Sequence, residues 1–506
     1  MKNTLVYIPS GLPSPELEIL LSKAQSSIKK KNNTVIAICR GGNNYACSYN
    51  IYAIQSICYF CKLNRKRAIN KLSGKYKIIE SPPINIKKKF NIITSNVKKL
   101  KSYKYKLVDV GQAAYSSYLA TSRDQSLEGT LSKYSLSNLL TTSEILVDWF
   151  NSSIKKHRIS EIILYNGRQN QYRPLLRVGT LNKVSTVVME FCGQSDKNVY
   201  KFKNKMPQDL NTLYKYINKE VQKFKGNKRN CADDYYEIKR SGGKINDNKS
   251  YVLNQSLNLL PQDFDKTKHN IAIFNSSEDE FAALGGEYDE TLYKNQFEAI
   301  TKICQSLHFE QDIQIWLRIH PNLTHVKWGF AKKLLLLDKH FKNVSVIKAG
   351  SKVSSYALLD ASSKIISFGS TMGVEAAYAG KPSILLARCI YEKLGSVYVP
   401  KSHEEVVNLL KNRQLKPLPK NGAYKTAIFW THGGSQIDYF RGNRTLGFTF
   451  NKLKIKRHKI ELFKYYIIKA IEKIIFNNLV NFYCKKRELY KTDSSQIKIR
   501  FLRMFI

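Results

Sequence analysis

Long apolar segments are absent from this 506-residue sequence. No uninterrupted apolar stretch is long enough to span a bilayer, and the apolar run at residues 5–8 is too short for the core of a signal peptide. We therefore expect a cytoplasmic protein, in which the nine cysteines are reduced. The sequence also lacks RNP, zinc-finger and helix-turn-helix patterns, so we expect no nucleic-acid partner.

Acidic residues are scarce relative to basic ones. The chain has 83 Lys and Arg against 39 Asp and Glu, which gives a net charge of +44. Such a charge favours anionic partners, such as nucleotide phosphates, acidic glycans or a membrane surface. Many individual lysines nevertheless need no partner beyond solvent. The 43% hydrophobic and 11% aromatic content is typical of a globular protein, and the length allows two or three domains.

Strand-like and helix-like segments alternate in two regions of the chain. The first region opens with a strand at 5–8, a helix at 15–29 and a strand at 35–38, and it includes further strands at 107–110, 161–165 and 184–188. The second region has strands that begin near residues 270, 313, 344, 365 and 383, with helices between them. This alternation predicts an α/β fold with two Rossmann-like, doubly wound domains.

The stretch 313–386 holds the most informative pattern. One apolar strand runs into Arg318 and His320-Pro321, and a second strand is followed by the small-residue turn 369–373 and a helix start. Hydroxyls and free backbone N–H groups at a helix start can hold a phosphate. Since ligands of open α/β sheets bind at the carboxyl ends of strands, we expect Arg318 and His320 to face the same crevice. The pattern predicts a nucleotide-sugar site.

The N-terminal region contains four of the nine cysteines within a short stretch, namely Cys39, Cys47, Cys58 and Cys61. The last two form a C-x-x-C pair, a spacing that suits a zinc site or a redox pair. The pair is predicted on one helix among apolar residues, where buried thiols behave as small hydrophobes. We prefer packing to metal binding for these cysteines.

Three polar residues follow strands of the first region. Asn166 and Arg168 come after the strand at 161–165, and Glu190 comes after the strand at 184–188. In a two-domain enzyme these strand ends would face the interdomain cleft, on the acceptor side. For Arg168, a structural salt bridge is an equally good interpretation.

Two motifs resemble those of a known family. Residues 318–321 read Arg-Ile-His-Pro, and residues 367–376 read Ser-Phe-Gly-Ser-Thr-Met-Gly-Val-Glu-Ala. Together they resemble the bacterial capsule-polysaccharide glycosyltransferases, which are GT-B proteins related in motif to polysialyltransferases and to transferases that add Kdo to capsule lipid. The loop 276–280, the turn 166–168 and the cysteine-rich stretch are similar to members of the same group. The resemblance spans most of residues 1–440.

The resemblance implies roles for individual residues. His320 would contact the donor phosphate, Ser370 and Thr371 would hold phosphate oxygens, and Glu375 would accept the ribose hydroxyls. For Glu375 the alternative is a partner of the helix dipole. The predicted donor site consists of Arg318, His320, Pro321, Ser367, Ser370, Thr371, Gly373 and Glu375.

Glycosyl transfer with inversion needs a general base for the acceptor hydroxyl. The acidic run Glu278, Asp279 and Glu280 supplies candidates, and Glu190 is the alternative. The polysialyltransferase-like group places its acidic pair directly before a glycine, whereas Gly285 comes several residues later here. The acidic run also fits the first turn of a helix. The chain has no Asp-x-Asp motif beside a strand end, so we expect a metal-independent reaction without a cofactor.

These expectations define four segments. They are an acceptor-side Rossmann-like domain at 1–197, a linker or insertion at 198–268 that is most exposed at 226–250, a nucleotide-sugar-binding Rossmann-like domain at 269–414, and a basic helical extension at 415–506. The apolar face of residues 463–476 suits either a membrane surface or packing on the sheet.

The function expected from these features is a glycosyltransferase of capsule or surface polysaccharide synthesis. Its partners would be a CMP-, CDP- or UDP-linked sugar and a glycan or glycolipid acceptor, with contact at the inner face of the plasma membrane left open. The alternatives are a nucleotide-sugar epimerase of the same fold and a non-catalytic, membrane-associated glycan-binding protein.

Overall fold

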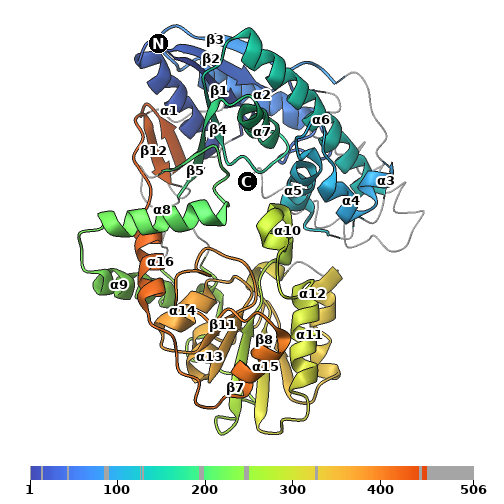
Figure 1. The fold of residues 1–506 in the computed structure, drawn as a ribbon, viewed down its shortest axis with the longest axis vertical. Helices are drawn as coiled ribbons and strands as arrows, with labels where there is room; N and C mark the ends of the chain where they lie inside the picture. The colour runs from blue at the N-terminus through green and yellow to red at the C-terminus, as the bar shows by residue number, and fades with distance from the viewer. Residues whose placement is uncertain are drawn as a thin grey trace. The chain divides into compact units, whose positions relative to one another are not determined.

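A computed structural model shows the fold of the protein (Figure 1). It describes residues 2–12, 15–42, 45–84, 91–125, 127, 130–192, 199–243, 250–324, 329–443 and 447–452. The described residues within 1–191, 195–207 and 435–506 form one compact unit, unit 1. Those within 192–194 and 208–434 form a second, unit 2.

Unit 1 is built on a six-stranded sheet in the order β3-β2-β1-β4-β5-β6. Its strands are β1 (Asn3–Ile8), β2 (Asn33–Ile38), β3 (Lys77–Glu80), β4 (Glu161–Tyr165), β5 (Ser185–Phe191) and β6 (Val199–Lys203). The first five strands run parallel and β6 runs antiparallel beside β5. Val6 of β1 lies between Ile36 of β2 and Ile163 of β4 in register. All three side chains are buried, as expected for the centre of a parallel sheet.

The helices of unit 1 connect its parallel strands. They are α1 (Pro15–Lys29), α2 (Gln55–Ile69), α3 (Asn91–Thr94), α4 (Val97–Ser102), α5 (Val110–Ser122), α6 (Thr130–Lys156) and α7 (Arg173–Leu181). Of these, α3 to α6 follow one another between β3 and β4. Pro15 opens α1, where its missing N–H costs no hydrogen bond. Leucines of α1 belong to one hydrophobic cluster with the hairpin formed by β12 (Phe440–Asn443) and β13 (Gly447–Phe450). Phe440 and Phe450 of this hairpin are fully buried. The chain therefore returns to unit 1 after completing unit 2.

Unit 2 contains a five-stranded parallel sheet in the order β11-β10-β7-β8-β9. Its strands are β7 (His269–Phe274), β8 (Ile313–Arg318), β9 (Val344–Ile347), β10 (Lys364–Ser367) and β11 (Ser383–Leu385). Ile273 of β7 pairs with Leu317 of β8 and Ile366 of β10, and all three are buried. The five parallel strands of each unit share one doubly wound order. The predicted α/β fold with two Rossmann-like units is thereby confirmed.

Helices surround the sheet of unit 2. They are α8 (Leu210–Lys223), α9 (Lys228–Arg240), α10 (Glu278–Leu284), α11 (Gln296–Ser306), α12 (Gly329–Leu334), α13 (Ser355–Ala361), α14 (Met372–Tyr378), α15 (His403–Lys411) and α16 (Asn421–His432), with 3-10 turns η1 (Val252–Asn254), η2 (Gly286–Asp289), η3 (Pro321–Leu323) and η4 (Leu337–Lys339). Ser402 caps α15 by accepting the N–H of Glu405 at 3.1 Å.

The structure differs from the sequence expectations at several elements. The strand predicted at 107–110 is wrong, because Lys106 and Leu107 adopt positive φ angles of 46° and 68° and form a tight turn before α5. The edge strands β3 and β6 were not predicted. In β3 the burial pattern is mostly exposed, so no apolar run marks it. Part of the expected exposed linker is instead α9, which buries Tyr235 and Tyr236.

Two predictions concern the C-terminal part of the chain. The expected extension begins with α16 in unit 2 and continues with the hairpin in unit 1, but the possible membrane-surface helix at 463–476 lies outside the described residues. Among the helices that the structure describes, none combines the length and apolar character needed to cross a membrane.

Candidate functional site

The carboxyl ends of β7, β8 and β10 in unit 2 are joined by a hydrogen-bonded turn. Ser276 donates its hydroxyl to the backbone oxygen of Phe368 at 2.7 Å, and its N–H donates to Gln296 Oε1 at 3.0 Å. The N–H of His320 donates to Asn275 Oδ1 at 2.7 Å. Asn275 and Ser276 are buried, so this edge of the sheet is held rigidly. The sheet order reverses between β7 and β10, which is where open α/β sheets bind ligands.

His320 lies at this edge with a defined ring orientation. Its Nδ1 accepts the N–H of Asn322 at 3.1 Å, and Pro321 begins η3 directly after it. The ring also meets Tyr251 edge to face, with ring centroids 5.4 Å apart. Because Nδ1 is an acceptor, a neutral His320 ring carries its proton on Nε2. Nε2–H is a donor of the kind that a phosphate oxygen accepts.

Arg318 differs from its expected place as a phosphate ligand in the crevice. Its side chain is 2% exposed, and its guanidinium donates to the backbone oxygens of Lys348 at 2.5 Å and Ser351 at 3.2 Å. Burial lowers the pKa of Arg318 to about 10. The side chain therefore holds the loop that follows β9.

The small-residue turn after β10 owes its shape to two glycines. Gly369 has a φ of 77°, and a Cβ there would lie 2.6 Å from the Phe281 ring. A Cβ on Gly373 would lie 2.2 Å from Ser367 Oγ and 2.6 Å from Tyr391 OH. Neither position accepts a larger residue without movement of its neighbours.

The hydroxyl groups of the same turn are positioned by short contacts. Ser370 Oγ accepts the N–H of Met372 at 3.3 Å, and the hydroxyl of Tyr391 donates to the backbone oxygen of Ser370 at 2.5 Å. Ser367 Oγ lies 3.2 Å from the same tyrosine oxygen. Tyr391 thus connects the end of β10 with the start of α14.

Glu375 is buried and ion-paired. It is 3% exposed, and its two carboxylate oxygens accept from Lys239 Nζ at 2.6 Å and from Tyr356 OH at 2.5 Å. Lys239 also donates to Thr371 Oγ1 at 3.1 Å. Burial acts to raise the pKa of Glu375. The positive charge of Lys239 and the hydrogen bonds of Lys239, Tyr356 and Thr371 outweigh this effect and hold the pKa below its ordinary value. Both oxygens that were expected to accept ribose hydroxyls therefore have partners within the protein.

Sequence reasoning missed Lys239, because it lies in the segment interpreted as a linker. A signal was present nevertheless. Ala232, Tyr235 and Tyr236 have the three- and four-residue spacing of a helix face, and all three are buried.

The acidic run Glu278, Asp279 and Glu280 occupies the first turn of α10. This placement agrees with the alternative to a catalytic role, in which the run forms a helix start. Glu278 Oε1 accepts the N–H of Gln296 at 2.8 Å, Asp279 is buried, and Glu280 accepts from Asn322 Nδ2 at 3.2 Å. Burial raises the pKa of Glu278 to about 7. Glu278 can therefore gain or lose a proton near neutral pH, which is what general-base catalysis requires.

The predicted acceptor-side residues lie together in unit 1. Asn166 Nδ2 donates to Glu190 Oε2 at 2.7 Å, and the hydroxyl of Tyr165 donates to Oε1 at 3.4 Å. The N–H of Arg168 donates to Asn166 Oδ1 at 3.1 Å. Burial raises the pKa of Glu190 to about 7, against the opposing effects of Asn166 and Arg168. Glu190 is thus a second candidate for proton transfer.

Two further carboxyl groups of unit 1 were not predicted. Glu16 is 2% exposed and accepts from the hydroxyls of Tyr172 and Tyr49. Burial raises the pKa of Glu16 to about 7 and that of Glu18 to about 8. Glu16 in turn helps to raise the pKa of Glu190. No sequence signal separates these residues from ordinary carboxylates in the first turn of a helix.

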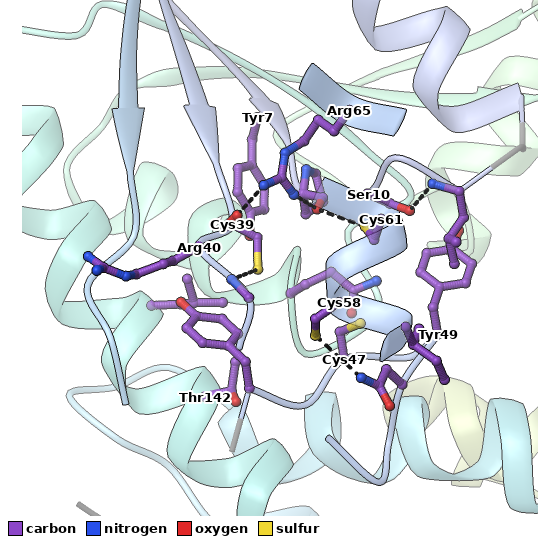
Figure 2. Close-up of a pocket in the computed structure, with 18 residues that line it drawn as sticks. Tyr7, Ser10, Cys39, Arg40, Cys47, Tyr49, Cys58, Cys61, Arg65 and Thr142 are labelled. Atoms are coloured by element: carbon purple, nitrogen blue, oxygen red, sulfur yellow. Dashed lines mark hydrogen bonds between the residues drawn. The ribbon is translucent and has the colours of Figure 1, made fainter. Parts of the chain in front are cut away.

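The four N-terminal cysteines line one pocket of unit 1 (Figure 2). Burial raises the pKa of Cys39 to about 12 and also raises the pKa of Cys47 and Cys58. Cys61 accepts a backbone N–H, and the buried Arg65 donates to the backbone oxygen of Cys39. Within the described parts of the chain, no group of three or more His, Cys, Asp or Glu is arranged to hold a metal ion. Cys61 packs against the small hydrophobic cluster of Leu12 and Phe60.

The family match concerns mainly unit 2. Residues 194–414 match the family described as "Capsule polysaccharide biosynthesis protein", which confirms over that segment the resemblance inferred from the motifs. No curated protein matches the sequence.

Solved structures with a similar course of the chain include two kinds of protein. The "beta Kdo 2,4 transferase" of Thermosulfurimonas dismutans KpsC is 14% identical, covers 53% of this chain and 79% of its own, and has a TM-score of 0.34. The "beta Kdo 2,7 transferase" of the same protein is 15% identical, covers 55% and 80%, and has a TM-score of 0.31. The UDP-GlcNAc 2-epimerase of Methanocaldococcus jannaschii is 12% identical, covers 85% and 98%, and has a TM-score of 0.26. Likenesses this distant decide nothing about activity.

Proposed function

We propose that this protein, whose residues 194–414 match the capsule polysaccharide biosynthesis family, is a glycosyltransferase. It would move a sugar from a nucleotide-activated donor to a glycan or glycolipid acceptor during synthesis of capsule or surface polysaccharide. The observation that carries the proposal is the arrangement of residues at the carboxyl edge of the unit 2 sheet, where the strand order reverses between β7 and β10. There His320, the turn 369–372 and Glu278 belong to the matched segment and follow adjacent parallel strands.

The donor phosphate is assigned to His320 and to the turn after β10. His320 presents Nε2–H when neutral, because Nδ1 is already an acceptor. Ser370 and Thr371 add hydroxyl groups at the turn, and stabilising the departing phosphate is a main requirement of glycosyl transfer. The pyrimidine diphosphate and monophosphate donors remain equal candidates.

The general base is assigned to Glu278, with Glu190 as the alternative. Each has a pKa raised to about 7 by burial, near the optimum for accepting a proton from an acceptor hydroxyl. Glu278 lies in the same unit as His320. Asn322 links the two, because its N–H donates to the His320 ring and its side-chain amide donates to Ser277, the residue before Glu278. We propose a reaction without a metal, since the sequence has no Asp-x-Asp motif after a strand.

Nucleotide binding is the first test of this proposal. Calorimetry with CMP, CDP, UDP and GDP should show that the protein binds one of them selectively. His320→Ala should weaken that binding by about tenfold or more, as expected for loss of a hydrogen bond to a charged group. His340→Ala, at an exposed histidine of the same unit, is the matched control. If none of these nucleotides binds, the proposal is wrong.

Product analysis distinguishes the transferase from an epimerase. The nucleotide-sugar of the selected donor class is incubated with and without a capsule-type oligosaccharide, and the sugar products are identified. A transferase converts the sugar to a glycosidic product only with the acceptor present. An epimerase changes the sugar without any acceptor, and that result would replace the proposed activity.

A further inference from the structure

The end of α9 is fixed against α13, α14 and α16 of unit 2. The ring of Tyr236 stacks on Tyr378 with centroids 4.1 Å apart, and its hydroxyl donates to the backbone oxygen of Ala423 at 3.0 Å. One turn later, Arg240 donates to both carboxylate oxygens of Asp360 at 2.8 and 2.9 Å. These contacts on either side of Lys239 determine where its side chain can reach.

The ammonium group of Lys239 lies at the turn assigned to the donor phosphate. It donates to Glu375 Oε1 at 2.6 Å and to Thr371 Oγ1 at 3.1 Å. An ammonium group has three N–H donors, and these two contacts use two of them. The side chain is 24% exposed whereas that of Glu375 is 3% exposed, so an incoming ligand can reach the cation more easily than the carboxylate.

Glu375 is poorly suited to hold ribose while this arrangement persists. A ribose diol would have to replace both the Lys239 and the Tyr356 contacts, because each occupies one carboxylate oxygen. Removing the partner of a buried charge is strongly unfavourable. The carboxylate is better suited to hold the lysine in place.

We propose that Lys239 binds a phosphate oxygen of the nucleotide-sugar donor, and that Glu375 and Tyr356 position its ammonium group. The ligand class is a nucleoside mono- or diphosphate, recognised by the third ammonium donor together with the Thr371 hydroxyl. This inference rests on the proposed nucleotide-sugar function and names the cation of the same site. It reassigns Glu375 from a ribose ligand to a positioning residue.

The test is calorimetric titration of the nucleotide that the wild-type protein selects into Lys239→Met, Glu375→Gln and Arg240→Met. We expect Lys239→Met to weaken binding by about tenfold or more, as for loss of a charged hydrogen bond. Glu375→Gln keeps the cation and an acceptor oxygen, so it should weaken binding several-fold less. Arg240→Met breaks the ion pair with Asp360 and removes the guanidinium that lies 4.8 Å from the ring centroid of Tyr356, so it measures the effect of loosening α9 and Tyr356 while the Lys239 cation is kept.

The outcomes separate this inference from the function on which it rests. If the wild type binds a nucleotide but Lys239→Met binds equally well, or no worse than Arg240→Met, the assignment of Lys239 is overturned while the transferase proposal stands. A larger loss in Glu375→Gln than in Lys239→Met would restore the ribose role and also overturn it. No nucleotide binding by the wild type contradicts both.

A second variant guards against misfolding of Lys239→Met. Lys239→Met with Glu375→Gln leaves no unpaired buried charge, so its fold should be retained. It is expected to bind the nucleotide as weakly as Lys239→Met, with an unchanged circular dichroism spectrum. Wild-type affinity in this folded double variant would overturn the inference.

Discussion

The two units share one strand order, but three carboxyl groups of unit 1 and Glu375 of unit 2 have pKa values shifted in opposite directions. In unit 1, loss of solvent contact raises the pKa of Glu16, Glu18 and Glu190 to about 7 or 8. In unit 2, Glu375 is as deeply buried, yet Lys239 keeps its pKa below the ordinary value. The difference shows that burial raises the pKa of a carboxyl, whereas direct contact with an ammonium group, as between Glu375 and Lys239, holds the pKa low.

Glu278 is the exception in unit 2, since burial raises its pKa to about 7. The largest expected effect therefore concerns its role as base. Glu278→Gln should lower the transfer rate by about 10²–10⁴-fold, the range typical of a lost general base. It should also remove the rise in rate with pH near pH 7.

The measurement is the pH dependence of kcat/KM with the identified donor and acceptor. Glu190→Gln tests the alternative base, because the pKa of its carboxyl is also raised to about 7. If Glu190→Gln removes the rise in rate and Glu278→Gln retains it, the base comes from unit 1.

The ion pair of unit 2 can be broken directly. Lys239→Met leaves Glu375 charged and buried without its cation, which should cost about 3–5 kcal/mol of stability. Lys239→Met with Glu375→Gln should recover most of this loss. Denaturant unfolding monitored for unit 2 gives both values, and an unchanged stability in the single variant would show that the pair is not formed.

The carboxyls of unit 1 predict a pH dependence of opposite sign. A carboxyl whose folded-state pKa is raised makes the folded protein less stable as pH increases from the ordinary value of 4.5 through the raised value. Glu18→Gln should therefore stabilise unit 1 at pH 8 by roughly 2–4 kcal/mol and change little near pH 4.

Glu375 is expected to affect the pH dependence of stability with the opposite sign to Glu18. Its pKa is lowered, so the stability that it contributes is present above the ordinary value of 4.5 and is lost as the pH falls below it. Thermal unfolding of Glu18→Gln and wild type from pH 4 to pH 8 tests the sign. Equal stability at pH 8 would mean that Glu18 has an ordinary pKa in the folded protein.

The strands of both sheets could be predicted because burial on two faces leaves nearly continuous apolar runs. The segments 313–319 and 344–347 are examples, and the structure places β8 and β9 there. The exposed edge strand β3 has no such run and was missed. The turn at Lys106 and Leu107 was mistaken for a strand. Its left-handed backbone conformation cannot be recognised from the sequence, because residues 107–110 are mostly apolar or β-branched, as in a strand.

The placement of residues at the carboxyl edge of the sheet was predictable where they follow strands in sequence, as with His320 and Ser370. It was not predictable where the partner comes from a distant segment. Lys239 reaches Glu375 from 136 positions away, and Tyr49 reaches Glu16 from 33 positions away. Arg318 shows the converse, since its position after a strand suggested a ligand contact whereas its guanidinium binds two backbone oxygens.

The smallest expected effect compares one close glycine from each edge. A Cβ on Gly11 of unit 1 would lie 2.1 Å from the backbone oxygen of Cys61, which cannot move without shifting α2. A Cβ on Gly373 of unit 2 has its two closest contacts with side-chain ends, Ser367 Oγ and Tyr391 OH, and lies 3.0 Å from Ser367 Cβ, so most of the overlap can be relieved by side-chain rotation. Since overpacking costs about 1–3 kcal/mol, we expect Gly11→Ala near the upper limit and Gly373→Ala near the lower. Equal losses in denaturant unfolding would show that the turn of unit 2 is as rigid as the backbone contact of unit 1, and that Tyr391 fixes the donor turn more firmly than its hydrogen bonds alone require.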